Sequence, residues 1–490
     1  MSNSYKDIIK SSGLIAYVQI FQMIFGLARN KVVALVLGTA GFGIWGLFST
    51  FMEMVTAFST LGIDQSGVRD IAKKSEDKIA VAKCVFVFRT SIILMSCLLC
   101  VISIIFSKTI SLFLFNSSSY QTGVIALSFV IIFKGISCGN VSILNGLRKL
   151  SDLAKGQIFG TIIGSLSTIL LVLIWKDKAI PWALLSIGLT LAISTGWFVS
   201  KLHITKVKVH FREYKEIFRP LFILGLSFSF SALISTIMTL LSRSYLSSHF
   251  DLGAVGIYQA SWTISNLYIG IILSAMGVDF MPRLMKVFND NKEVNVLINQ
   301  QLEMGILLSS LGVVGILLFS DLFLYLLYSK EFIVGSEIIR WQVLGVAMRI
   351  FAFPFSYAIA AKGKALLYAI TQLIFWTLDY LLLMFFGNIF GFDGLGVNYV
   401  VAYSVFVLMV YVSCQKIYSF KIARAVQILI IKIILFILVA WFIAYLSSGV
   451  MLYVLSTIEL IVLICFINHY MVNNMGINLL LLLRNRIRKK

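Results

Sequence analysis

The sequence predicts an all-α integral membrane protein of about fourteen transmembrane helices, built as two halves of similar plan. Hydrophobic residues make up 59% of the 490 residues and charged residues only 13%, too little polarity to cover a soluble protein of this size. The apolar residues gather into runs of about 20, the length a helix needs to cross a hydrocarbon core of about 30 Å. In chain order the runs lie near 12–37, 41–63, 80–106, 120–146, 154–174, 180–200, 220–246, 253–280, 296–327, 336–361, 365–387, 395–415, 425–446 and 450–471.

An internal repeat divides these runs. The stretch Leu37–Trp45 (LGTAGFGIW) is echoed by Phe250–Tyr258 (FDLGAVGIY), at an offset of 213–215 residues. The same offset relates Lys134 to Arg349. Two membrane-embedded halves with a site between them are typical of secondary transporters, so the repeat indicates transport.

We expect four parts in the chain. Residues 1–203 form an N-lobe of spans 1–6, and residues 220–418 form a C-lobe of spans 7–12. Between them, residues 204–219 are a cytoplasmic linker, either amphipathic and lying along the membrane surface or a plain basic loop. Residues 419–490 add a further helix pair, spans 13 and 14, and a basic cytoplasmic tail.

The positive charge is concentrated on one side of the predicted membrane. If the N-terminus is cytoplasmic, 29 of the 41 lysines and arginines fall in cytoplasmic segments and 4 in outside loops. The positive-inside rule therefore places both termini in the cytoplasm. The net charge of +20 then faces anionic lipid, which excludes nucleic acid as a partner.

Cysteine and histidine give no sign of a metal site or a cofactor. The six cysteines lie in or beside apolar segments, and the four histidines are scattered along the chain. The predicted outside loops are too short to form a catalytic domain, and a His/Asp or His/Glu constellation is missing. We therefore expect a transporter and not an enzyme, with no cofactor.

Ionisable residues inside the spans are the candidate site, because each is costly in lipid unless it meets a partner or a wet cavity. Eight cations face four carboxylates there, and an anionic ligand would balance the excess. The candidates for binding a phosphate group are Arg29, Lys31, Lys134, Arg243 and Arg349. The alternative is that each arginine pairs with a carboxylate, as Arg29 could with Glu53. Arg89 and Arg340 could instead extend their charged ends to the membrane surface.

The remaining candidates have other roles. Lys432 and Glu459, on adjacent spans outside the repeat, are expected to pair with each other. The candidates for coupling to H⁺ or Na⁺ are Glu53, Asp379 and Glu303. The candidates for a cytoplasmic gate, which could equally be local ion pairs at helix ends, are Asp64, Arg69, Asp279 and Arg283. The hinge candidates are Gly26 and Pro354.

The motif pair Arg29 … Leu37–Trp45 and Leu61–Asp64 … Arg69-Asp70 resembles the N-terminal half of Wzx-type oligosaccharide flippases. These belong to the multidrug/oligosaccharidyl-lipid/polysaccharide (MOP) exporter superfamily, and the resemblance extends over roughly residues 8–420. It implies two pseudo-symmetric six-helix lobes that rock to give alternating access. By similarity, Arg29 and Arg243 would approach the diphosphate of the cargo. Spans 13 and 14 resemble the extra pair of the lipid II flippases, whereas Asn30 departs from the acidic residue found there.

The resemblance also implies a cargo and a location. The cargo would be an undecaprenyl-diphosphate-linked oligosaccharide, such as an O-antigen repeat unit for lipopolysaccharide, moved to the outer leaflet of the bacterial inner membrane. A glycan polymerase and a chain-length regulator are further candidate partners. The alternative is another MOP exporter, such as a drug antiporter, but a carrier of cationic drugs should have an acidic cavity.

Overall fold

The chain folds into helices joined by short turns. The structure is a computed structural model that describes residues 2–74, 76–205, 207–476 and 478, and none of these forms a strand. The predicted basic tail at 484–490 lies outside the described residues. The helices are α1 (Ser2–Thr60), α2 (Ile63–Lys73), α3 (Lys78–Ile105), α4 (Ser107–Phe115), η1 (Ser118–Tyr120), α5 (Gln121–Gly146), α6 (Leu150–Trp175), η2 (Lys176–Ala179), α7 (Ile180–Ser200), α8 (Phe211–His249), α9 (Leu252–Val287), α10 (Asn291–Leu318), α11 (Ser320–Leu327), η3 (Lys330–Gly335), α12 (Ser336–Ala361), α13 (Ala365–Phe390), η4 (Gly391–Gly396), α14 (Val397–Tyr418), α15 (Arg424–Leu446) and α16 (Gly449–Met475).

The predicted membrane class is confirmed. The described residues contain ten helical segments long and apolar enough to cross a membrane, or eleven with α8, which bends by 55° near residue 228. Three of the segments, at 17–60, 150–200 and 365–418, have 44, 51 and 54 residues. A helix of that length would span more than about 60 Å, twice the hydrocarbon core, so each provides two crossings. Counted in this way, the segments provide the fourteen predicted crossings.

Glycines make the sharpest turns of the N-terminal part. Gly38 has φ 66° and ψ −167°, so α1 consists of two helical legs that meet at this residue. Gly62, between α1 and α2, has φ 69°. Side chains strongly disfavour positive φ, which is why glycine stands at both positions. The first turn separates the predicted spans 1 and 2.

The chain separates into two compact units. The first comprises residues 1–259 and 327–331, and the second comprises residues 260–326 and 332–490. Helix α8 begins at Phe211 and belongs to the first unit, so part of the predicted linker continues directly into span 7. The predicted division into an N-lobe and a C-lobe at residues 204–219 was inferred from the internal repeat. The two units describe packing instead, so the division into lobes stays a prediction.

In the first unit, the two copies of the repeated glycine motif pack against each other. A Cβ atom on Gly43 would lie 1.8 Å from the carbonyl oxygen of Leu252, and one on Gly256 would lie 2.1 Å from that of Thr39. Only glycine permits backbones to approach so closely. Near the other end of α8, a Cβ on Gly62 would lie 2.1 Å from the carbonyl oxygen of Gly225. Helices α1 and α8–α9 are therefore in backbone contact at two separate places.

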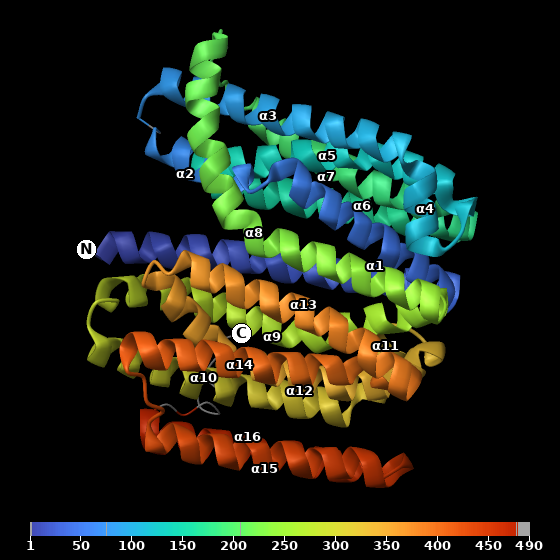
Figure 1. The fold of residues 1–490 in the computed structure, drawn as a ribbon, viewed down its shortest axis with the longest axis vertical. Coiled ribbons are helices and arrows are strands. Elements are labelled where there is room, and N and C mark those ends of the chain that lie inside the picture. Colours follow the sequence, from blue (N-terminus) through green and yellow to red (C-terminus); the bar gives the residue numbers. More distant parts are fainter. Residues whose placement is uncertain (1, 75, 206, 477, 479–490) are drawn as a thin grey trace, which may run out of the picture. The chain divides into compact units, whose positions relative to one another are not determined.

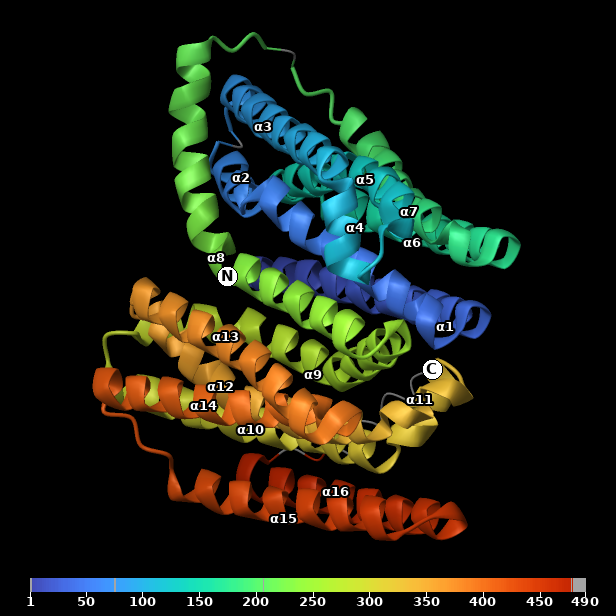
Figure 2. The same ribbon diagram turned by 45° about the vertical axis from the view of Figure 1, so that its right-hand side comes forward.

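In the second unit, α10, α12 and α14 pack together, and α15 and α16 lie side by side against α10 (Figure 1, Figure 2). Two asparagines on α10 hold the segment that leads into α15. Asn295 donates to the Tyr418 carbonyl at 3.1 Å and accepts from the Lys421 N–H at 2.9 Å. Asn299 donates to the Lys421 carbonyl at 3.1 Å and accepts from the Ala423 N–H at 2.8 Å. The pair of α15 and α16 is thus held against α10 by these hydrogen bonds as well as by apolar packing.

Details of the backbone follow the internal repeat. Asp77 and Asp290 each cap a helix by accepting two backbone N–H groups, at the start of α3 and α10. The turn after α5 has φ 55° at Arg148, and the turn after α12 has φ 75° at Gly363, 215 residues later. The surrounding backbone hydrogen bonds also match at this offset, from Leu147, Arg148 and Lys149 in one turn and from Lys362, Gly363 and Lys364 in the other. The two halves are therefore built to one plan.

Candidate functional site

The kink at Gly38 brings Arg29 beside the second leg of α1. The Arg29 guanidinium carbon lies 5.5 Å from the centroid of the Trp45 ring, a cation–π contact. In a straight helix these residues would be about 24 Å apart along the axis. Arg29 Nη2 donates to Asn30 Oδ1 at 3.4 Å, and its buried Nε has no hydrogen-bond acceptor among the described residues. The guanidinium therefore keeps donor capacity that neighbouring side chains leave unused.

Arg243 reaches the same leg of α1 from α8. Its side chain is 5% exposed, and its Nη1 donates to the Gly46 carbonyl at 3.1 Å. The Thr50 hydroxyl donates to the same carbonyl at 2.8 Å. In the part of the chain that the structure describes, the buried Nε of Arg243 has no acceptor. Arg29 and Arg243 thus approach consecutive residues of α1, Trp45 and Gly46.

Glu53 and Lys134 complete this group in the first unit. Glu53, exposed on the second leg of α1, attracts both Lys134 of α5 and Arg243. Lys134 is in turn repelled by Arg29. We call Arg29, Lys134, Arg243 and Glu53 the N-terminal charge cluster. It holds three basic groups and one acidic group, so its charge is positive when all four are ionised.

Lys31 is a predicted phosphate-binding residue that lies on a different face of α1 from Arg29. It is half-buried on the first leg of α1, two residues after Arg29. Residues two apart in a helix lie on different faces. Lys31 therefore cannot share the face through which Arg29 meets Trp45, and its role in binding stays a prediction.

Arg349 and Asp379 belong to a second polar group, in the second unit. Arg349 of α12 donates to Asn266 Oδ1 at 3.2 Å and lies beside the hydroxyls of Tyr399 and Tyr403. Asp379 of α13 is buried and accepts from Asn398 Nδ2 at 2.7 Å. Sequence reasoning missed the three α14 residues of this group, although polar side chains one turn apart in an apolar span were a usable signal.

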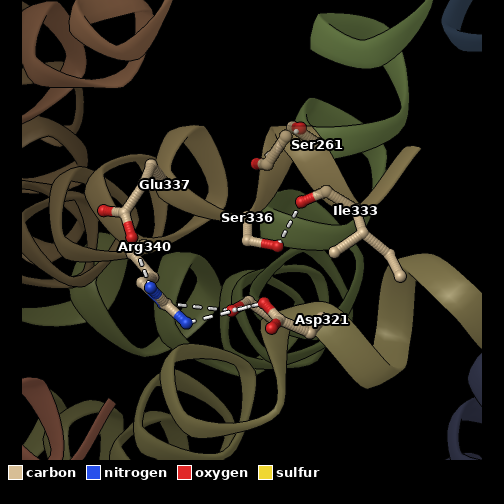
Figure 3. A network of polar contacts seen from close by, with 8 residues as sticks. Ser261, Asp321, Ile333, Ser336, Glu337 and Arg340 are labelled. Carbon is tan, nitrogen blue, oxygen red and sulfur yellow. Dashed lines mark hydrogen bonds and ion pairs between the residues drawn. The ribbon is translucent and has the colours of Figure 1, made fainter. Parts of the chain in front are cut away.

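Arg340, by contrast, has its charge matched by carboxylates. Its Nη2 lies 3.5 Å from Asp321 Oδ1, and its Nη1 donates to Glu337 (Figure 3). Its Nε donates to the Ser320 hydroxyl at 3.2 Å. Within the described part of the chain, Arg29 and Arg243 form no such ion pair. The alternative that each arginine pairs with a carboxylate therefore holds for Arg340 and not for these two.

The gate candidates differ between the two halves. Arg283 Nη1 donates to Asp279 Oδ2 at 3.1 Å, one helical turn away. Asp64 lies instead beside Thr60 and Cys138, and burial raises the pKa of its carboxyl group. The spacing of five residues between Asp64 and Arg69 places them about 140° apart around a helix, which explains why this ion pair is missing from the described structure.

Two further predictions concern Glu303 and the pairing of Lys432 with Glu459. Glu303 of α10 accepts from the Tyr470 hydroxyl of α16 at 2.7 Å. The predicted pairing of Lys432 with Glu459 is wrong, because their side chains lie in different surroundings. Lys432 is exposed with its ammonium 5.7 Å from the Phe466 ring centroid, whereas Glu459 is buried and its Oε1 has no partner.

The hinge candidates do not coincide with the break in α1. That break is at Gly38, whereas Gly26 lies within the first helical leg. Pro354 lies inside the continuous helix α12. Both stay predictions about motion. No group of three metal-ligating side chains occurs among the residues that the structure describes.

Comparison with known proteins decides the family. The profile of the family described as "Polysaccharide biosynthesis protein" matches residues 8–288, more than half of the chain. The chain belongs to this family. The matched region contains Arg29, Glu53, Lys134 and Arg243, so the N-terminal charge cluster lies entirely within it.

Individual proteins agree with this assignment. The chain is 22% identical over 364 residues to the "Lipid III flippase" of Escherichia coli (strain K12), covering 72% of this chain and 85% of that protein. Its fold resembles the "Lipid II flippase MurJ, inward closed conformation", with a TM-score of 0.72, 18% identity, and coverage of 95% and 100% of the two chains. It also resembles an inward-facing "multidrug resistance MATE family transporter of the MOP superfamily", with a TM-score of 0.67, 16% identity, and coverage of 83% and 99%. The chain therefore shares the fold of these two transporters.

Proposed function

We propose that this protein is a flippase that moves undecaprenyl-diphosphate-linked oligosaccharide from the cytoplasmic to the outer leaflet of the bacterial inner membrane. The observation that carries the proposal is the N-terminal charge cluster, in which Arg29 and Arg243 have buried donors without acceptors. A diphosphate supplies acceptor oxygens and negative charge to such donors. Membership of a polysaccharide biosynthesis family and similarity to a lipid III flippase support a glycan cargo.

The cluster suggests how an ion gradient could drive the cargo. Glu53 attracts Lys134 and Arg243, so protonation of its carboxylate removes that attraction and makes the cluster more positive for a diphosphate. Asp379, buried and bonded to Asn398, is the second coupling candidate. Alternating access of the two lobes would then expose the loaded site to either leaflet.

Drug export is the weaker alternative. The likeness to a multidrug transporter concerns the fold alone at 16% identity. A carrier of cationic drugs needs carboxylates that face its cargo, whereas the N-terminal charge cluster holds three basic groups and one carboxylate. The sign of the charge cluster therefore favours an anionic substrate.

The test uses cells that lack the protein and receive it back as wild type, Arg29→Gln, Arg243→Gln or Arg212→Gln at matched membrane levels. Arg212 is the control, because it is exposed and pairs only with Glu216 in its own helix. We expect the deletion to accumulate undecaprenyl-diphosphate-linked oligosaccharide and to lose surface glycan. Wild type and Arg212→Gln should rescue both, whereas each cluster variant should rescue at least about tenfold less, the usual effect of losing a charge-assisted hydrogen bond.

The possible outcomes separate the cargo from the site. If the lipid-linked unit does not accumulate in the deletion, the flippase assignment fails. If it accumulates and both cluster variants rescue fully, the cargo stands and the arginine site is wrong. The glycan that disappears, O antigen, capsule or another polymer, identifies the cargo further.

Ion coupling is tested with Glu53→Gln and Asp379→Asn. In wild type we expect transport into sealed vesicles to fall when the H⁺ or Na⁺ gradient is collapsed. The variant of the true coupling residue should be insensitive to the gradient, because its side chain no longer changes charge. Glu216→Gln, an exposed carboxylate of α8, is the control. If both variants depend on the gradient as wild type does, neither residue couples the ion.

A further inference from the structure

A second basic site lies in the first unit, apart from the N-terminal charge cluster. An open pocket of about 490 Å³ is lined by Arg89 of α3, by Gly196, Val199 and Ser200 in the last turns of α7, and by His203 and Ile204 beyond it. The His203 ring Nδ1 lies 2.8 Å from the Lys201 carbonyl oxygen, so the other ring nitrogen is left for a ligand.

Arg89 is a cation without an ion pair in the described part of the chain. It is exposed, and so are Phe86 and Ile93, which lie three residues before and four residues after it on the same face of α3. An arginine on an apolar face that meets lipid is costly unless it finds an anion or water. The lipid phosphate layer is the nearest source of anions for such a residue.

The end of α7 places the pocket at the level of the membrane surface. Trp197 is 56% exposed, and the Lys201 ammonium lies 3.2 Å from the centroid of its ring. Exposed tryptophan together with lysine at the end of a span is typical of the interface between lipid and water. Lys201 thus adds a positive charge at this end of α7, one residue after the pocket-lining Ser200.

We propose that this pocket binds the phosphate of an anionic phospholipid headgroup. Arg89 supplies a planar pair of donors for phosphate oxygens, and the second ring nitrogen of His203 can accept from a headgroup hydroxyl. The acyl chains would lie along the exposed apolar face of α3. The site is distinct from the cargo site, and it requires no transport activity.

The test counts lipids on the full-length protein released from nanodiscs into a native mass spectrometer. Phosphatidylcholine nanodiscs receive increasing amounts of phosphatidylglycerol, with wild type, Arg89→Gln and Arg212→Gln compared. Wild type and Arg212→Gln should retain a phosphatidylglycerol molecule that phosphatidylcholine does not replace. Arg89→Gln should bind it about tenfold more weakly, because a charge-assisted contact is lost.

A wild-type measurement keeps the test independent of how the variants fold. Saturating inorganic phosphate should not displace the retained lipid, since it lacks the acyl chains that contact α3. Displacement by phosphate would mean a free-anion site and would overturn the lipid assignment. Equal retention by wild type and Arg89→Gln, or equal retention of both lipids by wild type, would overturn the proposal altogether.

Discussion

At the scale of single residues, the structure separates arginines whose charge is already matched from those that can bind a ligand. Arg340 is held by Asp321 and Glu337, whereas Arg29 and Arg243 meet an indole ring and a backbone carbonyl. All three are cations in predicted spans. Glu337 lies one turn before Arg340 in the same helix, so the sequence could have indicated that pair, whereas the contact with Asp321 depends on how α11 packs against α12.

Arg243→Lys tests whether the shape of the guanidinium matters as well as its charge. Arg243 donates from Nη1 to the Gly46 carbonyl, and its other N–H groups remain available to a ligand. Lysine has one compact ammonium and cannot serve both partners in the same way. We expect glycan export to fall about tenfold, with Arg212→Lys unchanged as the control. Export at the wild-type level by Arg243→Lys would show that charge alone suffices.

The positions of the charged residues in the spans could be predicted from the sequence, but their interaction partners were predicted less well. The repeat offset placed Lys134 and Arg349 at matching positions of α5 and α12. It did not predict that Arg349 meets Asn266, nor that Glu459 is buried away from Lys432. Helical periodicity fixes the face of a residue within its own helix, but the helix opposite that face depends on tertiary packing.

At the scale of elements, one face of α10 holds the C-terminal helix pair. Asn295, Asn299 and Glu303 are spaced by four residues and share this face, and each bonds to the segment after α14 or to α16. Glu303 therefore has a structural partner in addition to its predicted coupling role. The sequence showed these residues only as polar positions near the start of an apolar run.

Asn299→Ala should loosen the connection between α14 and α15. The change removes three hydrogen bonds, to the carbonyls of Asn295 and Lys421 and from the Ala423 N–H, and losing the two that hold the segment costs about 1–3 kcal/mol. We expect amide exchange at Ala423 to accelerate about tenfold or more, as measured by hydrogen–deuterium exchange mass spectrometry. Asn474→Ala is the control, because Asn474 bonds only a carbonyl of its own helix. Unchanged exchange at Ala423 in the Asn299 variant would contradict the conclusion that Asn299 holds the segment between α14 and α15.

At the scale of the whole molecule, the internal duplication accounts for most of the structural features that could be predicted from the sequence. The repeat offset relates the capping aspartates Asp77 and Asp290, and it relates the turn after α5 to the turn after α12. A feature that the sequence indicates in one half is therefore also expected in the other. The sequence did not predict that the two glycine motifs would pack against each other. That contact depends on the tight turn at Gly38 and on the exact approach of α9, which no spacing rule fixes.

The contact between the glycine motifs yields a prediction about conformation. In Gly256→Ala, the new Cβ would lie 2.1 Å from the Thr39 carbonyl oxygen, and because this neighbour is backbone, the two segments must separate. Overpacking of this kind costs about 1–3 kcal/mol, which shifts a balanced conformational equilibrium at least about fivefold. Separation is measured by oxidative cross-linking of Thr39→Cys with Gly253→Cys, whose positions adjoin, in a protein without its six native cysteines.

We expect the cross-link to form readily in the parent protein and at least about fivefold more slowly with Gly256→Ala. The control is Gly315→Ala, a helical glycine of α10 whose added Cβ would meet no atom within 4 Å. If transport proceeds by alternating access, the cross-linked parent should also stop exporting glycan until it is reduced. Rapid cross-linking of the Gly256 variant would contradict the backbone contact, and undiminished export by the cross-linked parent would mean that these motifs need not separate during transport.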